Sequence, residues 1–328
     1  NTSAPLELLD EYHTSFYIHG DLNIIGGSFV PGANGNFDVF VRGDWTNTVG
    51  TDGFVEDWSR VTFDGDLQYM QSDETFNLLE VDCDDRLLIG DHIVECAKYN
   101  WTSGGIDVST GSFTALDLED DGLFGGYSVG NGGEINLTND GYVDLRGDVN
   151  VFGGTLNVTG TISWWPYNDD ASLMMTDGVI DFKACGITIK DNAYDLDVYI
   201  TGGKIKTVGN FINERSDVDL SQVDLELYGS GTHSLELAGN KTLDYIKINK
   251  TETEFSSKIK PTDRNGNPLP ESGKENKVSL TSDVQTDYVY LTSGSLYLNG
   301  KEMTVDFDFI VHEDGAFFMD NPDDILNV

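Results

Sequence analysis

The stretch YLTSGSLYLNGKEMTV, residues 290–305, decides the fold because it alternates short apolar runs with tight turns. The dipeptides Ser-Gly and Asn-Gly that separate its apolar residues are typical of turns between strands. A turn about every six residues leaves no room for a helix. We therefore expect short strands with one face in a core, and the core-facing residues are Leu291, Leu296, Leu298, Met303 and Val305.

The alternation of apolar and polar residues recurs along the whole chain. Residues 17–24, 39–45 and 143–151 are rich in β-branched and aromatic side chains and are bounded by Gly, Asn, Asp or Ser. A period of two places one face of each strand in a core and the other face in solvent. Only residues 6–12 have a spacing that could form about two turns of helix. The sequence therefore predicts an all-β chain.

Internal repeats favour one all-β architecture over the others. Gly-Asp followed by an apolar residue occurs at Gly20, Gly43, Gly65 and Gly147, and the first three are 23 and 22 residues apart. A second pattern precedes strand-like runs as GGSF (26–29), TGSF (110–113), GGTL (153–156), GGKI (202–205) and SGSL (293–296). Repeats of about 20 to 25 residues that hold two or three strands match the coils of a parallel β-solenoid, which stack about 4.8 Å apart. We expect this parallel β-helix, with short turns; a β-sandwich array is the alternative.

Composition divides the chain into four segments. Residues 1–15 precede the first repeat and are a candidate cap, or a strand donated to a neighbouring subunit. Residues 16–250 and 278–328 carry the solenoid repeats. Residues 251–277 hold three of the 7 prolines and five of the 19 basic residues. Because proline has no N–H to donate, this segment is predicted to be a loop insertion outside the coil, either a plain surface loop or a basic arm that meets an acidic neighbour.

The chain is strongly acidic, with 57 Asp and Glu, 19 Lys and Arg, and a formal net charge of −38. This balance argues against nucleic acids and anionic membranes as partners, because phosphate groups are bound by basic residues. No apolar run approaches the length of about 18 residues that a membrane span needs, so we expect no membrane insertion. The acidic surface and the start at Asn1 without a leader favour a mature secreted protein, extracellular or at the cell surface.

Three cysteines bear on the redox environment of the chain. Cys83 and Cys96 could close a short disulfide loop in an oxidising compartment, with Cys185 left buried and free. Plain buried thiols are the equal alternative. The sequence leaves this choice open.

Catalytic motifs are weak in this sequence. The acidic pairs 84–85, 120–121, 169–170 and 323–324 are the carboxylates that a polysaccharide hydrolase would need, but such pairs arise by composition in an acidic chain. No Gly-His-Gly, nucleophile elbow, P-loop or dinucleotide fingerprint is present. We expect no enzyme activity, with a polysaccharide hydrolase or lyase as the minor alternative.

Two surface clusters are candidate ligand sites. Trp164, Trp165 and Tyr167 could stack on a sugar, although an aromatic cap on a coil or a packing bulge is the favoured interpretation. The densest acidic group could bind Ca²⁺ through carboxylates and turn carbonyls, and it consists of Asp82, Asp84, Asp85 and Asp91. Acidic turns in plain solvent are the alternative. We expect no required cofactor.

Three tracts carry a resemblance to a known group of proteins: VTFDGDLQYMQSDETFNLLEV (61–81), LELYGSGTHSLELAGNKTLDYIKI (225–248) and residues 279–319. They resemble repeats of large adhesin-like surface proteins of Bacteroidetes-type bacteria, many of which leave the cell by the type IX secretion route. The resemblance is clear over 61–81 and 225–319 and looser over 16–60 and 100–215. It implies a solenoid at the cell surface and no particular activity.

The pattern as a whole predicts a secreted structural protein. We expect a subunit of a bacterial extracellular fibre, filament or surface adhesin that associates with itself head to tail, or with a cell-surface or glycan partner, through its solenoid ends. A carbohydrate-binding or carbohydrate-cleaving β-helix is the alternative. The predicted assembly residues are Leu6, Leu8, Leu9, Tyr12, Phe317, Phe318, Ile325 and Leu326.

Overall fold

The structure, a computed structural model, describes residues 6–8, 14–31, 37–118, 123–124, 126–145, 148–163, 172–184, 186–189, 191, 197–238, 242–250 and 276–328. The described residues form strands joined by turns, with no helix among them. They fall into two compact units. Unit 1 comprises Asn1–Lys183 with Asn192–Gly203, and unit 2 comprises Ala184–Asp191 with Lys204–Val328.

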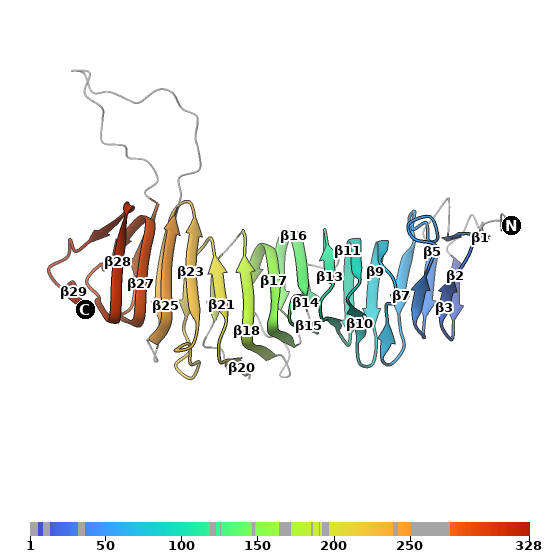
Figure 1. The fold of residues 1–328 in the computed structure, drawn as a ribbon, viewed down its shortest axis with the longest axis horizontal. Coiled ribbons are helices and arrows are strands. Elements are labelled where there is room, and N and C mark those ends of the chain that lie inside the picture. The colour runs from blue at the N-terminus through green and yellow to red at the C-terminus, as the bar shows by residue number, and fades with distance from the viewer. Residues whose placement is uncertain are drawn as a thin grey trace, which may run out of the picture. The chain divides into compact units, whose positions relative to one another are not determined.

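The strands of unit 1 can be followed from blue through green to yellow in Figure 1. They are β1 (Leu6–Leu8), β2 (Thr14–Ile18), β3 (Leu22–Ile24), β4 (Phe29–Pro31), β5 (Phe37–Val41), β6 (Trp45–Asn47), β7 (Arg60–Phe63), β8 (Gln68–Tyr69), β9 (Glu74–Asp82), β10 (Leu87–Gly90), β11 (Ile93–Ser103), β12 (Ile106–Val108), β13 (Ser112–Ala115), β14 (Leu123–Phe124), β15 (Tyr127–Val129), β16 (Glu134–Leu145), β17 (Val149–Ser163), β18 (Ser172–Phe182) and β20 (Asp197–Ile200).

The strands of unit 2 run from yellow to red in the same figure, apart from the short β19. They are β19 (Ile187–Ile189), β21 (Lys204–Thr207), β22 (Phe211–Asn213), β23 (Asp224–Gly229), β24 (Thr232–Leu237), β25 (Thr242–Lys250), β26 (Lys277–Leu280), β27 (Val284–Tyr297), β28 (Glu302–Phe318) and β29 (Ile325–Asn327).

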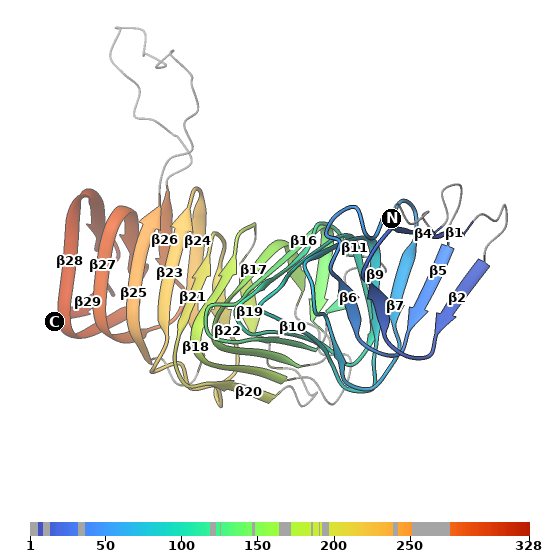
Figure 2. The ribbon, with the colours of Figure 1, turned by 45° about the vertical axis from the view of Figure 1, so that its right-hand side comes forward.

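Each coil places strands at three positions, and strands at the same position pair in parallel from coil to coil. In unit 1 the first coil holds β2, β3 and β4 at its first, second and third positions. The first-position strands β2, β5 and β7 pair with the registers Phe16↔Val39 and Val39↔Val61. At the second position β3 pairs with β6, and at the third β1 pairs with β4. Figure 2 shows strands of successive coils of unit 1 lying side by side. The parallel β-solenoid is thereby confirmed.

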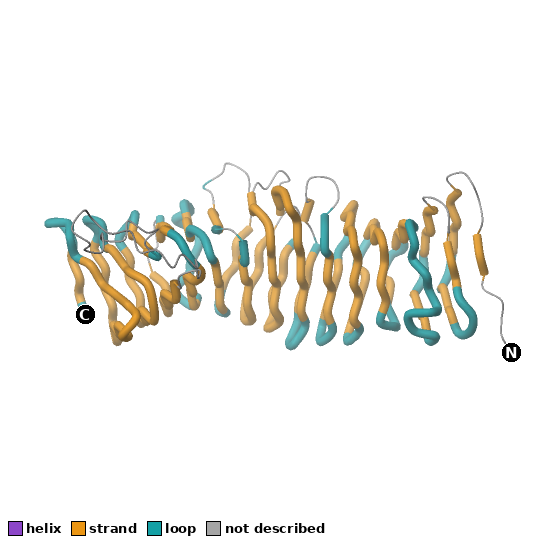
Figure 3. Tube along the Cα trace, turned by 90° about the horizontal axis from the view of Figure 1, so that it is seen from above, coloured by secondary structure: helices purple, strands orange, loops and turns teal. Residues whose placement is uncertain are grey.

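Unit 2 repeats this plan with longer strands that bend around the corners. Strand β27 covers the second position with 284–286, the third with 288–291 and the first position of the next coil with 293–297. Strand β28 lies on it in the same way with 303–305, 308–311 and 314–318. Figure 3 shows how the strands of neighbouring coils lie side by side, with turns between them.

The core lies inside the coils because side chains alternate between the two faces of each strand. In β5, Val39 and Val41 are fully buried, while Phe40 between them points outward. The five residues predicted to face the core in 290–305 are all at most 2% exposed, which confirms the predicted register. Burial of each such side chain contributes about 1.5 to 3 kcal/mol relative to exposure.

Backbone stacking at one corner explains the repeated Gly-Asp pair. The Asp21 carboxylate accepts a hydrogen bond from the backbone N–H of Asp44 at 3.0 Å, and the Asp44 carboxylate accepts one from Tyr69 N–H at 3.0 Å. A Cβ atom on Gly43 would lie 2.5 Å from the carbonyl carbon of Gly20. Glycine is therefore needed at Gly43, where the backbones of two neighbouring coils are in contact. The aspartate that follows accepts a hydrogen bond from a backbone N–H of the next coil.

Some expectations from the sequence need correction or fall outside the described part of the chain. Residues 6–12 do not begin a helix, because Leu6–Leu8 is the strand β1. Cys83 and Cys96 are both free and buried, and burial raises the pKa of the Cys83 thiol to about 12, so they are inert thiols in this structure. Cys185 and almost all of the proposed insertion (251–275) lie outside the described residues.

Candidate assembly interface

Within the described ranges, the last coil of unit 2 has a long strand edge without a partner strand. Strand β28 pairs with β27 along most of its length. On its other side it pairs with β29 only at Glu302–Thr304. Among the described residues, 305–318 of β28 therefore have no neighbouring strand on the outer side. Such an edge presents unpaired backbone N–H and C=O groups, which template the addition of a further strand.

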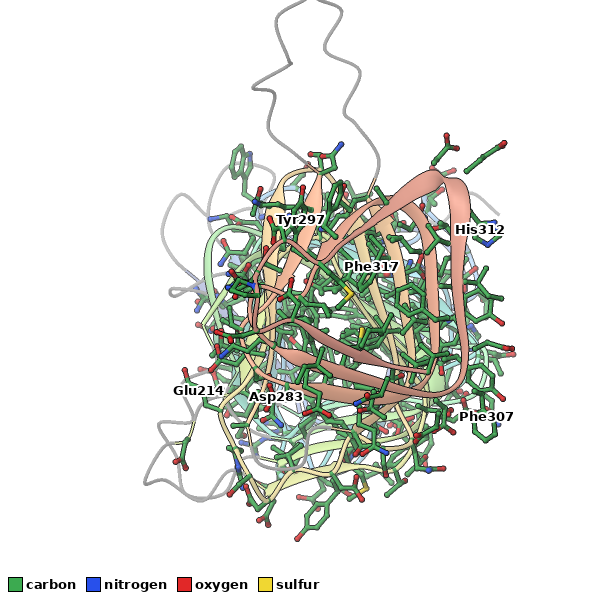
Figure 4. All side chains as sticks on the ribbon, turned by 90° about the vertical axis from the view of Figure 1, so that its left-hand side faces the viewer. Glu214, Asp283, Tyr297, Phe307, His312 and Phe317 are labelled. Carbon is green, nitrogen blue, oxygen red and sulfur yellow. The ribbon has the colours of Figure 1, made fainter. Side chains whose placement is uncertain are left out.

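The hydrophobic core is open at the same place. Phe309 and Val311 are in register with the buried Val289 and Leu291 of the preceding coil. Phe317 follows Leu296 in the same way, and its ring meets that of Phe309 edge-on at 4.9 Å. Val311 is 42% exposed although its counterpart Leu291 is fully buried. Figure 4 views this end, with Phe317 inside the ring of strands and His312 and Phe307 outside it.

Aromatic rings on the outer surface stack along successive coils and stop at β28. Phe318 stacks on Tyr297 with ring centroids 4.5 Å apart and planes 8° from parallel. Phe307 stacks on Tyr288 at 5.3 Å and is itself 62% exposed. The ammonium of Lys277 lies over the ring of Tyr297 at 4.9 Å, which extends the first stack by one cation–π contact. Both stacks therefore end on rings that belong to the open edge.

The first coil of unit 1 forms a second end with related features. Strand β1 pairs with β4 and β2 pairs with β5, and within the described ranges neither has a strand on its other edge. Tyr17 on β2 is 55% exposed and stacks on Phe40 with ring centroids 4.7 Å apart. In β1, Leu6 is in register with the buried Phe29 and Leu8 with the buried Pro31.

The predicted assembly residues divide between these two ends. Phe317 and the half-buried Leu326 belong to the open core layer, because Leu326 is in register with the buried Met303. Phe318 and Ile325 lie on the outer surface, Ile325 being 48% exposed. Leu6 and Leu8 form β1, whereas Leu9 and Tyr12 lie outside the described residues.

The sequence reasoning missed Tyr17. Its ring stacks on that of Phe40, which lies one coil further along the chain. Tyr17 and Phe40 are 23 residues apart, the same interval that separates Gly20 from Gly43. That spacing was the available signal.

The predicted calcium ligands are not gathered into one group. The Asp82 carboxylate accepts a hydrogen bond from Ser103 Oγ at 3.0 Å. Asp85 lies 3.9 Å from the Arg86 guanidinium, and Asp91 lies 3.6 Å from the His92 ring. Among the described residues, no three His, Cys, Asp or Glu side chains are placed to hold a metal ion. Calcium binding stays a prediction.

Only some of the carbohydrate candidates lie among the described residues. Trp164, Trp165 and Tyr167 lie outside the described residues, as do the acidic pairs 120–121 and 169–170. In the pair 323–324, the Asp324 carboxylate accepts hydrogen bonds from the backbone N–H groups of Gly300 at 2.5 Å and Asn321 at 2.9 Å. Asp324 therefore ties two turns together.

Two buried ionisable side chains have structural partners that account for them. Glu74 accepts hydrogen bonds from Trp45 Nε1 and Asn47 Nδ2, both at 2.9 Å, and burial raises its pKa above the ordinary value. Lys250 Nζ donates to the carbonyl oxygens of Tyr228 at 2.7 Å and Val208 at 3.2 Å. Burial lowers the pKa of Lys250 to about 8. Both side chains thereby link neighbouring coils.

Comparison with known protein-family models gave no match, and comparisons with curated proteins and with solved structures gave none either. Within the described part of the chain, no helix is long and apolar enough to cross a membrane.

Proposed function

We propose that the chain is a secreted structural protein, a β-solenoid subunit of an extracellular fibre or surface adhesin, which associates end to end through its open coils. The observation that carries this proposal is the edge of β28, where backbone without a partner strand among the described residues occurs together with the partly exposed core residue Val311. Solenoids that stay monomeric cover such an end with a polar cap. In the described chain, the apolar side chains of Phe309, Val311 and Phe317 lie at this edge.

Physical chemistry favours another solenoid end as the partner for this surface. A strand added to β28 would complete its backbone hydrogen bonds and cover the rings of Phe309 and Phe317 at once. A contact between two different ends of one chain is heterologous, so it repeats from copy to copy and builds an open filament, or a ring where the rotation between copies closes. The net charge of −38 opposes close approach, and the assembly should therefore need salt to screen it.

The test compares two substitutions that place a lysine at an exposed apolar position. Val311→Lys puts a charge into the open core layer. Leu116→Lys is the matched control, because Leu116 is 63% exposed on the side of unit 1. Sedimentation velocity and negative-stain microscopy should show filaments or concentration-dependent oligomers for the unchanged protein and for Leu116→Lys, but monomers for Val311→Lys. Circular dichroism checks that each variant is folded.

A different result would overturn the proposal. If the unchanged protein is monomeric at every concentration and salt level, end-to-end association is wrong. Binding of that monomer to neutral polysaccharides on a glycan array, or their turnover, would then favour the carbohydrate-binding or carbohydrate-cleaving alternative. If Val311→Lys assembles as well as Leu116→Lys, the association uses some other surface.

A further inference from the structure

The two solenoid ends are complementary in the order of their strands. Strand β28 supplies the third position of one coil with 308–311 and the first position of the next with 314–318. Strand β29 then supplies the second position by pairing with Glu302–Thr304. The described residues contain no strand for the third position of this coil. Among the described residues, strands are present for two of the three sides of this coil.

The beginning of unit 1 has one strand more than its first coil needs. Strands β2, β3 and β4 fill the three positions of that coil, and β1 pairs with β4, the third-position strand. Strand β1 therefore occupies the third position of a coil that has no other side among the described residues. Among the described residues, the last coil of unit 2 has no third-position strand, and unit 1 has an additional third-position strand, β1.

We propose, building on the end-to-end association above, that β1 of a second copy fills the third position beside β28, with Leu6 opposite Phe309, Glu7 opposite Ile310 and Leu8 opposite Val311. All strand pairs on both sides of this joint are parallel, so the added strand continues the ladder without a change of direction. Strands β2 and β3 of the second copy then follow on 314–318 of β28 and on β29. One joint thereby closes all three sides of the coil.

The alternation of faces fixes the parity of this register. Leu6 and Leu8 occupy positions opposite the buried Phe29 and Pro31, and Phe309 and Val311 occupy positions opposite buried residues of β27. A shift by one residue would put Glu7 at a core position, where its charge would be buried without a partner. Shifts by two residues keep the parity but leave one leucine beyond the open core layer.

Aromatic stacking supports the same joint at the first position. Tyr297 and Phe318 form a nearly parallel stack that reaches the open edge of β28. Tyr17 and Phe40 form another, with planes 10° from parallel, that begins at the open edge of β2. Both stacks lie on the outer surface of first-position strands. Placing Tyr17 of the second copy against Phe318 joins them into one stack of four rings.

Mixing two singly substituted proteins tests the register directly. In a Cys185→Ser background, Glu7→Cys is mixed with Ile310→Cys under mild oxidation in about 0.15 M NaCl, which limits charge repulsion to about 8 Å. Opposed residues on neighbouring strands are about 4.8 Å apart, within the reach of a disulfide. The proposal predicts a covalent dimer containing one of each protein. The native Cys83 and Cys96 are buried and do not compete.

Two matched mixtures serve as controls. Glu7→Cys is mixed with Asp308→Cys or with His312→Cys, which lie two residues to either side of Ile310. Their Cα atoms would be about 8 Å from that of Glu7 in the proposed register, too far for a disulfide. Neither of these mixtures, nor any of the single variants alone, should form much covalent dimer.

The outcomes separate this inference from the proposed function. Efficient cross-linking of position 7 to position 310 alone supports the joint. Association with preferred cross-linking to 308 or 312, or with none, overturns the register while end-to-end assembly stands. A protein that never associates overturns both.

A second variant pair tests the aromatic contact without new cysteines. Tyr17→Ala should weaken association about 2- to 10-fold, the value of one aromatic pair. Tyr199→Ala is the control, because Tyr199 is 54% exposed against 55% for Tyr17 and lies on β20. Equal association constants for the two variants would remove the stacking contact from the joint.

Discussion

Replacing Gly105 by alanine should destabilise unit 1, because two coils touch backbone to backbone at this residue. A Cβ atom there would lie 2.1 Å from the carbonyl oxygen of Gly126 and 2.8 Å from its carbonyl carbon, against 3.4 Å for an ordinary contact. The same oxygen accepts a hydrogen bond from Ile106 N–H at 2.6 Å. The coils would therefore have to separate locally and stretch or break that bond.

The magnitude follows from these two effects. Overpacking costs about 1 to 3 kcal/mol and a lost backbone hydrogen bond about 0.5 to 1.5 kcal/mol. We expect the free energy of unfolding to fall by about 2 to 4 kcal/mol. Gly26→Ala is the control, because a Cβ on Gly26 meets nothing within 4 Å. Its smaller unfolded-state entropy should raise stability by about 0.4 to 1 kcal/mol. Neither glycine has a positive φ, so the contrast isolates stacking.

Urea unfolding followed by circular dichroism measures both variants against the unchanged protein. Because solenoid coils unfold with some independence, hydrogen exchange of the amides near residues 87–129 localises the loss. Equal stability of Gly105→Ala and Gly26→Ala would refute the reasoning, since it would mean that these coils do not approach each other as the structure has them.

Three further results are expected. Leu298→Asp should cost about 4 kcal/mol or more, because Leu298 is fully buried and the carboxylate finds no partner there; an unchanged melting temperature would contradict the register of 290–305. The free energy of unfolding of Lys250→Met, relative to that of the unchanged protein, should be highest at neutral pH and should fall between about pH 8 and 10.5. Over that range the unfolded chain binds more protons than the folded one, so the unchanged protein gains stability as the pH rises and the variant does not. Parallel curves of stability against pH would exclude this origin. Micromolar to millimolar Ca²⁺ should raise the melting temperature, and a chelator should lower it. If NaCl at matched ionic strength gives the same shift, the cause is screening of the acidic charge and not a specific Ca²⁺ site.

Short-range regularities made the fold predictable from the sequence. The period-two alternation in 290–305 identified Leu291, Leu296 and Leu298 as core residues, and all three are fully buried. The 22- and 23-residue spacing of Gly-Asp pairs indicated the coil length, because each pair packs against the same corner of the next coil. Strand β5, with Val39 and Val41 inward, follows the alternation without exception.

Contacts between coils could not be predicted from the sequence, because they depend on which residues of neighbouring strands lie opposite each other. Residues 6–8 have too few neighbours in the chain to distinguish a strand from a helix, and only pairing with β4 makes them a strand. Glu74 and Lys250 are charged residues, yet they are buried, with hydrogen-bond partners from adjacent coils. The outer aromatic stacks, such as Tyr297 on Phe318, likewise require knowing which strand lies beside which.

The pairing of β24 with β26 shows that the solenoid tolerates additional residues between β25 and β26. Strand β26 lies on β24 with the register Thr232↔Lys277, and Asn276 accepts a hydrogen bond from Gly231 N–H across an interval of 45 residues. One coil earlier, Ser234 N–H reaches Asn210 across only 24 residues. The ladder therefore continues in register although the chain between Lys250 and Asn276 is a whole repeat longer. Chain length at that corner is independent of coil geometry, so an enzyme or antigen with adjacent termini could replace residues 251–275 and be displayed at regular intervals along any array these coils form.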